Sequence, residues 1–168
     1  MGQGNGSDFG REFRGWKVVS GLIAEAVLSK RPVCLDTPAV IAYLQGADAA
    51  AYLVAPILEH PRVTVVISTI SFCEVLVGPA MTGDEVTLRR IKSGLRRLPR
   101  LTVVSFDVEH AVAAAEVRGQ TGLKLPDAGI VATARLASAM AIIGNDRRWQ
   151  TKPLGVPYFQ LNDLISTS

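Results

Sequence analysis

The sequence is poor in cysteine and histidine, with two of each among its 168 residues. Disulfide-stapled secreted domains need several cysteine pairs, and zinc sites built from protein ligands usually need four Cys or His side chains. Neither kind of protein is compatible with this composition. We expect Cys34 and Cys73 to behave as small apolar side chains.

Long apolar runs are also missing. No stretch reaches the roughly 18 consecutive apolar residues that a membrane-spanning helix needs. Residues 18–28 are apolar and follow basic residues, as in a signal peptide, but Gly21 and Glu25 interrupt the stretch. We therefore expect a cytoplasmic protein without a membrane segment.

Acidic residues are slightly outnumbered by basic ones, which gives a net charge of +3. This balance is compatible with an anionic partner, although many unrelated proteins share it. The densest basic stretch contains no acid and consists of Arg89, Arg90, Lys92, Arg96, Arg97 and Arg100. Two interpretations stay open for it: a solvated helix face, or a track for RNA phosphates.

The first 31 residues differ from the rest of the chain. Residues 1–15 are rich in glycine and poor in apolar side chains, so we predict that 1–31 form a flexible leader. Between Trp16 and Lys30, apolar residues recur with helical spacing and Pro32 follows, so the leader can carry one extra helix. Residues 32–168 have the length of a single domain with a proper core.

The stretch Val33-Cys34-Leu35 runs directly into Asp36-Thr37-Pro38. A short apolar run without alternation is typical of a strand buried on both faces of a parallel sheet. Thr37 as N-cap and Pro38 as the first helical residue would then begin a helix. Ligands of such sheets bind at the carboxyl ends of the strands, where Asp36 would lie. The alternative for Asp36 is a purely structural role at the helix start.

Strands and helices are predicted to alternate along the rest of the chain. Further strands are expected at 63–68, 101–105, 140–143 and 156–161, the last at an edge of the sheet. Helices are expected at 38–45, 48–59, 71–78, 84–98, 107–119 and 126–139. Such alternation predicts an α/β fold with a parallel sheet.

Three more carboxylates fall near strand ends. Glu74 lies just past the second strand, Asp127 begins the helix that leads to the fourth strand, and Asp146 follows that strand. Each has a structural alternative: a capping box of Ser71 with Glu74, the helix dipole for Asp127, and an Asx turn for Asp146.

A parallel sheet would bring Asp36, Glu74, Asp127 and Asp146 to one rim. Carboxylates that converge there repel one another, and burial raises their pKa values. A hard divalent cation such as Mg²⁺ or Mn²⁺ prefers carboxylate oxygens and would resolve this conflict.

In order and spacing, these segments resemble the PIN-domain ribonucleases, most closely the VapC-type toxins of bacterial toxin–antitoxin pairs. The segments cover residues 33–161 and are Leu35-Asp36-Thr37, 71–78 with Glu74, Leu125-Pro126-Asp127 with 130–134, and Asn145-Asp146-Arg147. The resemblance implies an α/β/α sandwich with a central parallel β-sheet. It also implies a Mg²⁺- or Mn²⁺-dependent endoribonuclease, a cognate antitoxin as partner, and a homodimer.

The resemblance assigns roles to individual residues. Asp36 and Asp127 would hold the metal, with Glu74 and Asp146 acting directly or through water. Thr37 would orient Asp36 or bind a metal-held water. The basic residues that flank the acids and would hold RNA phosphates are Arg118, Lys124, Arg147 and Arg148.

Two positions depart from the family pattern, and one further acid follows a predicted strand. Pro38 stands where a small polar residue is common in the family, and Gly144 replaces a frequent Thr or Ser; both bear on the level of activity. Asp107 also follows a predicted strand, but the corresponding family strand lies away from the site. We therefore expect Asp107 to cap a helix.

Residues 39–58 carry an unusual amount of apolar surface, from Ile41, Tyr43, Leu44, Tyr52, Leu53, Ile57 and Leu58. We expect part of this surface to stay exposed and to form a groove for an antitoxin segment.

Other functions remain as alternatives. A non-catalytic PIN-fold module that binds RNA or protein is the main one, and the presence of all four acids argues against it. A phosphatase of the haloacid-dehalogenase type would need a second aspartate at position 38, which is Pro38. A serine hydrolase would need a Gly-x-Ser-x-Gly elbow, which the sequence lacks.

Overall fold

A computed structural model describes residues 14–165 of the chain. Its centre is one five-stranded sheet in the order β3-β2-β1-β4-β5, and all neighbouring strands are parallel. The strands are β1 (Val33–Leu35), β2 (Val65–Ser68), β3 (Leu101–Val104), β4 (Ala141–Gly144) and β5 (Tyr158–Gln160). The predicted parallel sheet is confirmed, with β1 in its middle and the last strand at an edge.

Eight α-helices surround the sheet in the described part of the chain. They are α1 (Arg14–Ser29), α2 (Thr37–Gln45), α3 (Ala49–Leu58), α4 (Thr69–Met81), α5 (Glu85–Arg96), α6 (Val108–Thr121), α7 (Leu125–Leu136) and α8 (Leu161–Ile165). A short 3₁₀-helix, η1 (Arg147–Trp149), follows β4.

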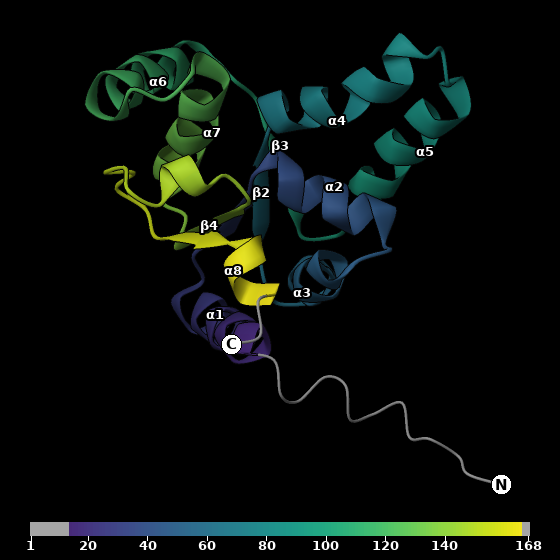
Figure 1. Cartoon of the computed structure of the whole chain (residues 1–168), viewed down its shortest axis with the longest axis horizontal. Helices are drawn as coiled ribbons and strands as arrows, with labels where there is room; N and C mark the ends of the chain where they lie inside the picture. Colours follow the sequence, from purple (N-terminus) through teal and green to yellow (C-terminus); the bar gives the residue numbers. More distant parts are fainter. Residues whose placement is uncertain (1–13, 166–168) are drawn as a thin grey trace, which may run out of the picture.

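Alternation along the strands divides the core into two layers. Val33 and Leu35 of β1 belong to a cluster that includes buried residues of α1 to α5 and α8. Cys34 between them belongs to a second cluster, which contains buried residues of α6 and α7. Figure 1 shows α6 and α7 on one side of the sheet and α2, α4 and α5 on the other. The predicted α/β/α sandwich is confirmed.

The helix expected within the leader is present as α1. Val19, Leu22 and Ala26 are buried and join the core, whereas Trp16 and Lys30, two ends of the predicted face, are exposed. At Gly15 a Cβ atom would lie 2.0 Å from the carbonyl oxygen of Leu164 in α8, so only glycine fits there. Residues 1–13 of the predicted leader lie outside the described residues.

Several helix boundaries differ from the predicted ones. Asp36, not Thr37, is the N-cap of α2, and Thr37 is its first residue. The helix α4 begins at Thr69 with Ser68 as its cap and continues through Pro79 to Met81. Helix α8 was not expected, because its five residues are too few to show a helical period.

The apolar residues of α2 and α3 are mostly accounted for by the core. Leu53, Ile57 and Leu58 are buried in the core. The prediction that these helices leave much apolar surface exposed is therefore largely wrong. Ile41 and Tyr52 remain exposed, by 36% and 76%.

Among the described residues, no single helix combines the length and apolarity of a membrane span. The pair α2 and α3 meets both criteria only when joined across a bend of 101°.

Candidate active site

The four predicted acids meet at the carboxyl edge of the sheet. Asp36 and Asp146 follow the neighbouring strands β1 and β4, Glu74 lies in the second turn of α4, and Asp127 lies in the first turn of α7. All four line one cleft of about 610 Å³. Its other walls come from α2, the start of α3, Asn145 and α8.

Asp36 is the most buried of these acids, with 5% of its surface exposed. Its N–H donates to the carbonyl of Ile143 (2.9 Å), which ties it to β4, and its Oδ1 accepts the N–H of Thr37 (2.7 Å). Burial raises the pKa of Asp36 to about 7, with a further rise from the charges of Asp127, Glu74 and Asp146. Asp36 therefore caps α2 and also points a strongly perturbed carboxyl group into the cleft.

Glu74 reaches the site through Thr37. The Thr37 hydroxyl donates a short hydrogen bond to Oε2 of Glu74. The alternative of a capping box with Ser71 is wrong, because α4 begins before Ser71 and Ser68 caps it. Ser71 is buried, and its hydroxyl has no partner among the described residues.

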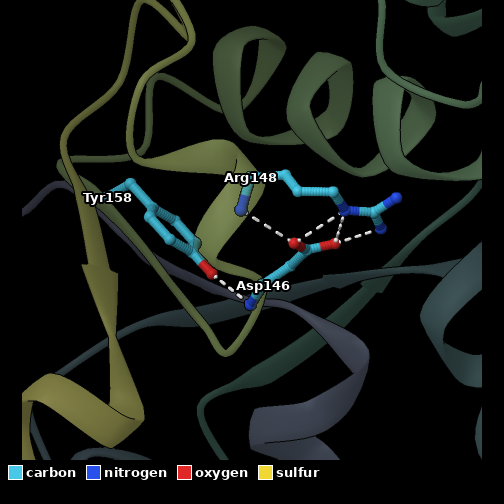
Figure 2. Close-up of polar contacts among 3 residues, drawn as sticks. All are labelled: Asp146, Arg148 and Tyr158. Atoms are coloured by element: carbon cyan, nitrogen blue, oxygen red, sulfur yellow. Dashed lines mark hydrogen bonds and ion pairs between the residues drawn. The ribbon is translucent and has the colours of Figure 1, made fainter.

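Asp146 is paired with an arginine (Figure 2). Its Oδ1 accepts the backbone N–H of Arg148 at 2.9 Å, so the Asx-type cap that was the structural alternative for Asp146 is present. The guanidinium of Arg148 holds both carboxylate oxygens, with Nε 3.0 Å from each. These hydrogen bonds lower the pKa of Asp146, in contrast to the raised pKa of Asp36.

Asp127 lies in the first turn of α7 but does not cap it, because α7 begins at Leu125 with Lys124 at the N-cap position. Burial raises the pKa of Asp127, and the negative charge of Asp146 raises it further. Arg148 and Lys124 act in the opposite direction. The carboxylate of Asp127 thus lies among groups of both signs.

Tyr158 belongs to the site, and the sequence interpretation missed it. Its Oη accepts the backbone N–H of Asp146 at 2.8 Å (Figure 2). A Cβ atom on Gly144 would lie 2.9 Å from that oxygen and 2.9 Å from Oδ2 of Asp36. Glycine at 144 therefore leaves room for the hydroxyl and the carboxylate to lie close together. Burial, followed by the charges of Asp36 and Asp146, raises the pKa of Tyr158.

Asp107 lies outside the cleft, as expected. Its Oδ1 accepts the N–H of His110 (3.0 Å) and lies 2.7 Å from Nδ1 of the same residue, so it caps α6.

The four flanking basic residues have different environments. Lys124 and Arg148 lie close enough to the acids to lower the pKa of Asp127. Arg118 donates from Nη1 to the carbonyl of Leu123 (2.7 Å) and so holds the turn between α6 and α7. Arg147 is exposed on η1.

The donor set of the cleft suits a hard cation, although no ready-made cage exists. Two of the four carboxylates are engaged, Asp146 by Arg148 and Glu74 by Thr37. Within residues 14–165, no group of three or more Cys, His, Asp or Glu side chains is arranged to hold a metal ion. The carboxylate of Asp127 and Oδ2 of Asp36 remain available to bind an ion. Carboxylate oxygens are the donors that Mg²⁺ and Mn²⁺ prefer.

Known structures share this architecture. A toxin–antitoxin complex from Klebsiella pneumoniae matches with a TM-score of 0.61 and 22% identity, over 77% of this chain and 97% of that one. FitAcB from Neisseria gonorrhoeae matches with a TM-score of 0.57 and 23% identity, over 77% and 97%. VapC20 from Mycobacterium tuberculosis, a toxin that cleaves the sarcin–ricin loop, matches with a TM-score of 0.52 and 16% identity, over 66% and 86%.

No curated protein sequence matches this chain significantly. The PIN domain, however, matches residues 33–153, from the first strand through the loop after η1. This range contains all four acids of the cleft and most of the chain. The protein therefore belongs to the PIN-domain family.

Proposed function

We propose that the protein is a divalent-metal-dependent endoribonuclease and the toxin of a cytoplasmic toxin–antitoxin pair. The observation that carries this proposal is the convergence of Asp36, Glu74, Asp127 and Asp146 on one open cleft. A group of carboxylates is a poor binding site for RNA unless a cation offsets its charge. Membership of the PIN family and the likeness to toxin–antitoxin structures support the choice of reaction and biological role.

Asp36 and Asp127 would hold the metal, because their oxygens are the least engaged of the four carboxylates. When bound, Mg²⁺ or Mn²⁺ lowers the pKa of a water molecule and offsets charge on the phosphodiester. Glu74, which Thr37 orients, and Asp146 would accept hydrogen bonds from waters around the ion.

The basic groups beside the acids would position the substrate. Arg148 can exchange its carboxylate partner for a phosphate, since a guanidinium binds both with the same bidentate geometry. Lys124, at the N-terminus of α7, would contribute a second positive charge next to Asp127. Arg147 is exposed on the same 3₁₀-helix as Arg148 and would meet the flanking RNA.

An antitoxin would close the cleft from outside. The similar structure from Klebsiella pneumoniae is a toxin–antitoxin complex. A basic side chain of such a partner would be attracted to the same carboxylates as the metal. The exposed Ile41 on the cleft wall offers an apolar contact next to them.

The engaged state of Asp146 favours one other function, a PIN module that binds RNA without cleaving it. If the guanidinium of Arg148 kept both oxygens of Asp146, only three acids would remain to bind a metal or its waters. One experiment decides between the two functions.

The test is cleavage of total RNA with and without Mg²⁺ or Mn²⁺, for the unmodified protein and two matched variants. We expect Asp127→Asn to lower cleavage by at least 100-fold, because it removes a direct metal ligand. Asp107→Asn should change cleavage less than twofold, because asparagine caps a helix nearly as well as aspartate. Undiminished cleavage by a folded Asp127→Asn protein would contradict the assigned site. No metal-dependent cleavage by the unmodified protein would favour the binding module.

A further inference from the structure

The outer face of α5 and the residues that follow it carry the strongest local charge in the described chain. Six basic side chains, Arg89, Arg90, Lys92, Arg96, Arg97 and Arg100, are all exposed. Five of them enclose, together with Ser93, a shallow open hollow of about 550 Å³. This basic face contains no acid between Arg89 and Arg100.

Little of the charge on the basic face is offset within α5, whose single acid is Glu85, one turn before Arg89. The ion pairs of the described residues are His110–Asp107 and Arg148–Asp146, and neither involves α5. The side chains of Arg89 and Arg100 donate only to backbone carbonyls, those of Glu85 (3.2 Å) and Pro61 (3.0 Å).

Packing of the helix does not explain these charges. Lys92 and Arg96 are four residues apart on one face, a spacing at which like charges repel and destabilise a helix. Contact with the core comes from the opposite side of α5, through the buried Leu95 and the half-buried Ile91. A helix that served only to cover the core would be more stable with pairs of opposite charge on its outer face.

The basic face also determines the net charge of the whole molecule. Outside it the remaining 12 Lys and Arg residues are outnumbered by the 15 Asp and Glu residues of the chain. The cleft itself gathers four carboxylates. A polyanion would therefore meet repulsion at the cleft, a nearly neutral balance of charge over the rest of the chain, and attraction at α5.

The composition of the basic face indicates which polyanion it fits. It contains no aromatic side chain on which a base could stack, so contacts would be with phosphates rather than with bases. Its apolar residues Ile91 and Leu95 pack toward the core, and the exposed Val86 of α5 lies before Arg89, outside the basic face, so this face offers no apolar side chain for insertion into a bilayer. Repeated phosphates along a nucleic-acid strand match a helix face that repeats positive charge at every turn.

We propose that the basic face of α5 is a docking surface for the phosphate backbone of RNA outside the segment that enters the cleft. The inference rests on the proposed action on RNA and extends it, because it places the main affinity for substrate away from the acids. RNA would bind α5 without sequence preference, and the cleft would select the bond that is cut.

The test compares two doubly neutralised proteins. Lys92→Gln with Arg96→Gln removes two charges from the basic face and keeps good helix formers. Lys17→Gln with Lys152→Gln removes the same number of charges from exposed positions on α1 and in the loop after η1. Circular dichroism establishes that both proteins are folded.

Binding is measured by fluorescence anisotropy in EDTA with a 20-nucleotide single-stranded RNA, so that cleavage plays no part. The α5 pair should weaken binding at least tenfold at 50 mM salt, and the control pair less than twofold. The slope of log affinity against log salt should fall by about 1.4 for the α5 pair, at about 0.7 for each lost phosphate contact.

Cleavage adds a second readout. With a 20-nucleotide substrate, kcat/KM should fall for the α5 pair, whereas a 6-nucleotide substrate that spans only the cleft should be cut equally by all three proteins. Equal RNA binding by the α5 pair and the unmodified protein would overturn the proposal. The proposal would also be overturned if the α5 pair lost affinity only for duplex DNA or only for anionic vesicles, and not for RNA. Weakened RNA binding by the α5 pair, in a protein that cleaves no RNA, would overturn the proposed nuclease and leave the docking surface standing.

Discussion

Single residues of the cleft show how one site can hold carboxyl groups in opposite states. Asp36 and Asp146 follow neighbouring strands, yet the pKa of Asp36 is raised to about 7 and that of Asp146 is lowered. Burial explains the raised pKa of Asp36, and the guanidinium of Arg148 explains the lowered pKa of Asp146. A cation that reaches Asp36 would remove the difference, which gives the site an intrinsic affinity for positive charge.

The raised pKa of Asp36 predicts how stability depends on pH in metal-free protein. The folded state binds this proton more tightly than the unfolded state, whose pKa is near 3.8. The free energy of unfolding should therefore fall as the pH rises from about 4 to about 7, by at most about 4 kcal/mol. In Asp36→Asn this loss should disappear, and the variant should be the more stable protein above pH 7.

Urea unfolding in EDTA at pH 4.5, 6 and 8 measures the effect. Asparagine keeps an oxygen that can accept the N–H of Thr37, so the start of α2 should be preserved. Added Mg²⁺ should stabilise the unmodified protein at pH 8 and leave Asp36→Asn nearly unchanged. Parallel pH curves for the two proteins would show that Asp36 is ionised without cost, and the pKa assigned to it would be wrong.

Gly144 provides a second prediction at this scale. A methyl group there would lie 2.9 Å from both Oη of Tyr158 and Oδ2 of Asp36, so one of them must move. Gly144→Ala should lower the free energy of unfolding by about 1–3 kcal/mol, as overpacking does, and reduce cleavage. Gly119→Ala is the matched control, because Gly119 lies in α6 with nothing within 4 Å of its added methyl group.

The control should gain about 0.5–1 kcal/mol, since alanine is the better helix former. Both values come from thermal or urea unfolding. If Gly144→Ala is as stable as Gly119→Ala, the close approach of Tyr158 to Asp36 does not exist in solution.

At the scale of secondary structure, local signals were sufficient for most elements. Asp48 and Asp107 each precede a helix and cap it with their side chains as predicted, and Asp84 caps α5 in the same way. Three of the acids could be predicted to converge from their places after strands, and Asp127 from its place at the start of the helix before β4, because a parallel sheet brings such positions to one edge. This part of the site needed only the order of elements along the chain.

What the sequence could not provide were contacts that depend on pairing between distant strands. Tyr158 bonds to the N–H of Asp146 and lies near Asp36 because β5 pairs with β4, and no spacing in the sequence marks it as a site residue. The predicted start of α4 at Ser71 was wrong for a local reason, because either Ser68 or Ser71 could cap a helix. Strand β2 ends at Ser68, and α4 begins directly after it, so Ser68 is the cap.

Helix α1 allows a test of whether the leader belongs to the folded unit. Leu22 is 6% exposed and packs in the core, whereas Leu28 on the same helix is 78% exposed. Leu22→Ala should lower the free energy of unfolding by about 2–4 kcal/mol, and Leu28→Ala by less than about 0.5 kcal/mol. Urea unfolding of the two variants gives both numbers. Equal effects would mean that α1 is not docked on the domain in solution.

At the scale of the whole molecule, charge is separated between two surfaces. The cleft gathers carboxylates, and the exposed face of α5 gathers arginines and one lysine, Lys92. Helix α5 lies away from α6 and α7, on the side of the sheet that carries α2 and α4 (Figure 1). This arrangement suits a substrate that is a polyanion and a partner that carries a cation. Under the proposed function, RNA would dock at α5 and enter the cleft together with a metal, whereas a basic protein segment would enter the cleft without one.

The last prediction concerns that protein segment. Ala49 and Ala50 of α3 line the cleft, and Tyr52, about one turn along the same helix, is 76% exposed. A bound antitoxin segment that leaves the cleft along α3 would cover this ring, and buried tyrosines are frequent hot spots of interfaces. Tyr52→Asp should therefore weaken antitoxin binding by more than about 2 kcal/mol, or about 30-fold in Kd. The neighbouring Leu53 is buried and unsuitable for the test, because an aspartate there would unfold the core.

The control for Tyr52→Asp is Leu136→Asp, at a residue that is 40% exposed on α7 in the opposite layer. Binding is measured by calorimetry with the proposed antitoxin, sought in the reading frame next to the gene of this protein, and cleavage of RNA is measured with and without it. Cleavage alone should survive in both variants, since neither residue lines the cleft. Tyr52→Asp should then still cleave RNA at antitoxin concentrations that inhibit cleavage by the unmodified protein. Full inhibition of Tyr52→Asp at those concentrations would place the antitoxin elsewhere and leave Tyr52 an ordinary exposed tyrosine.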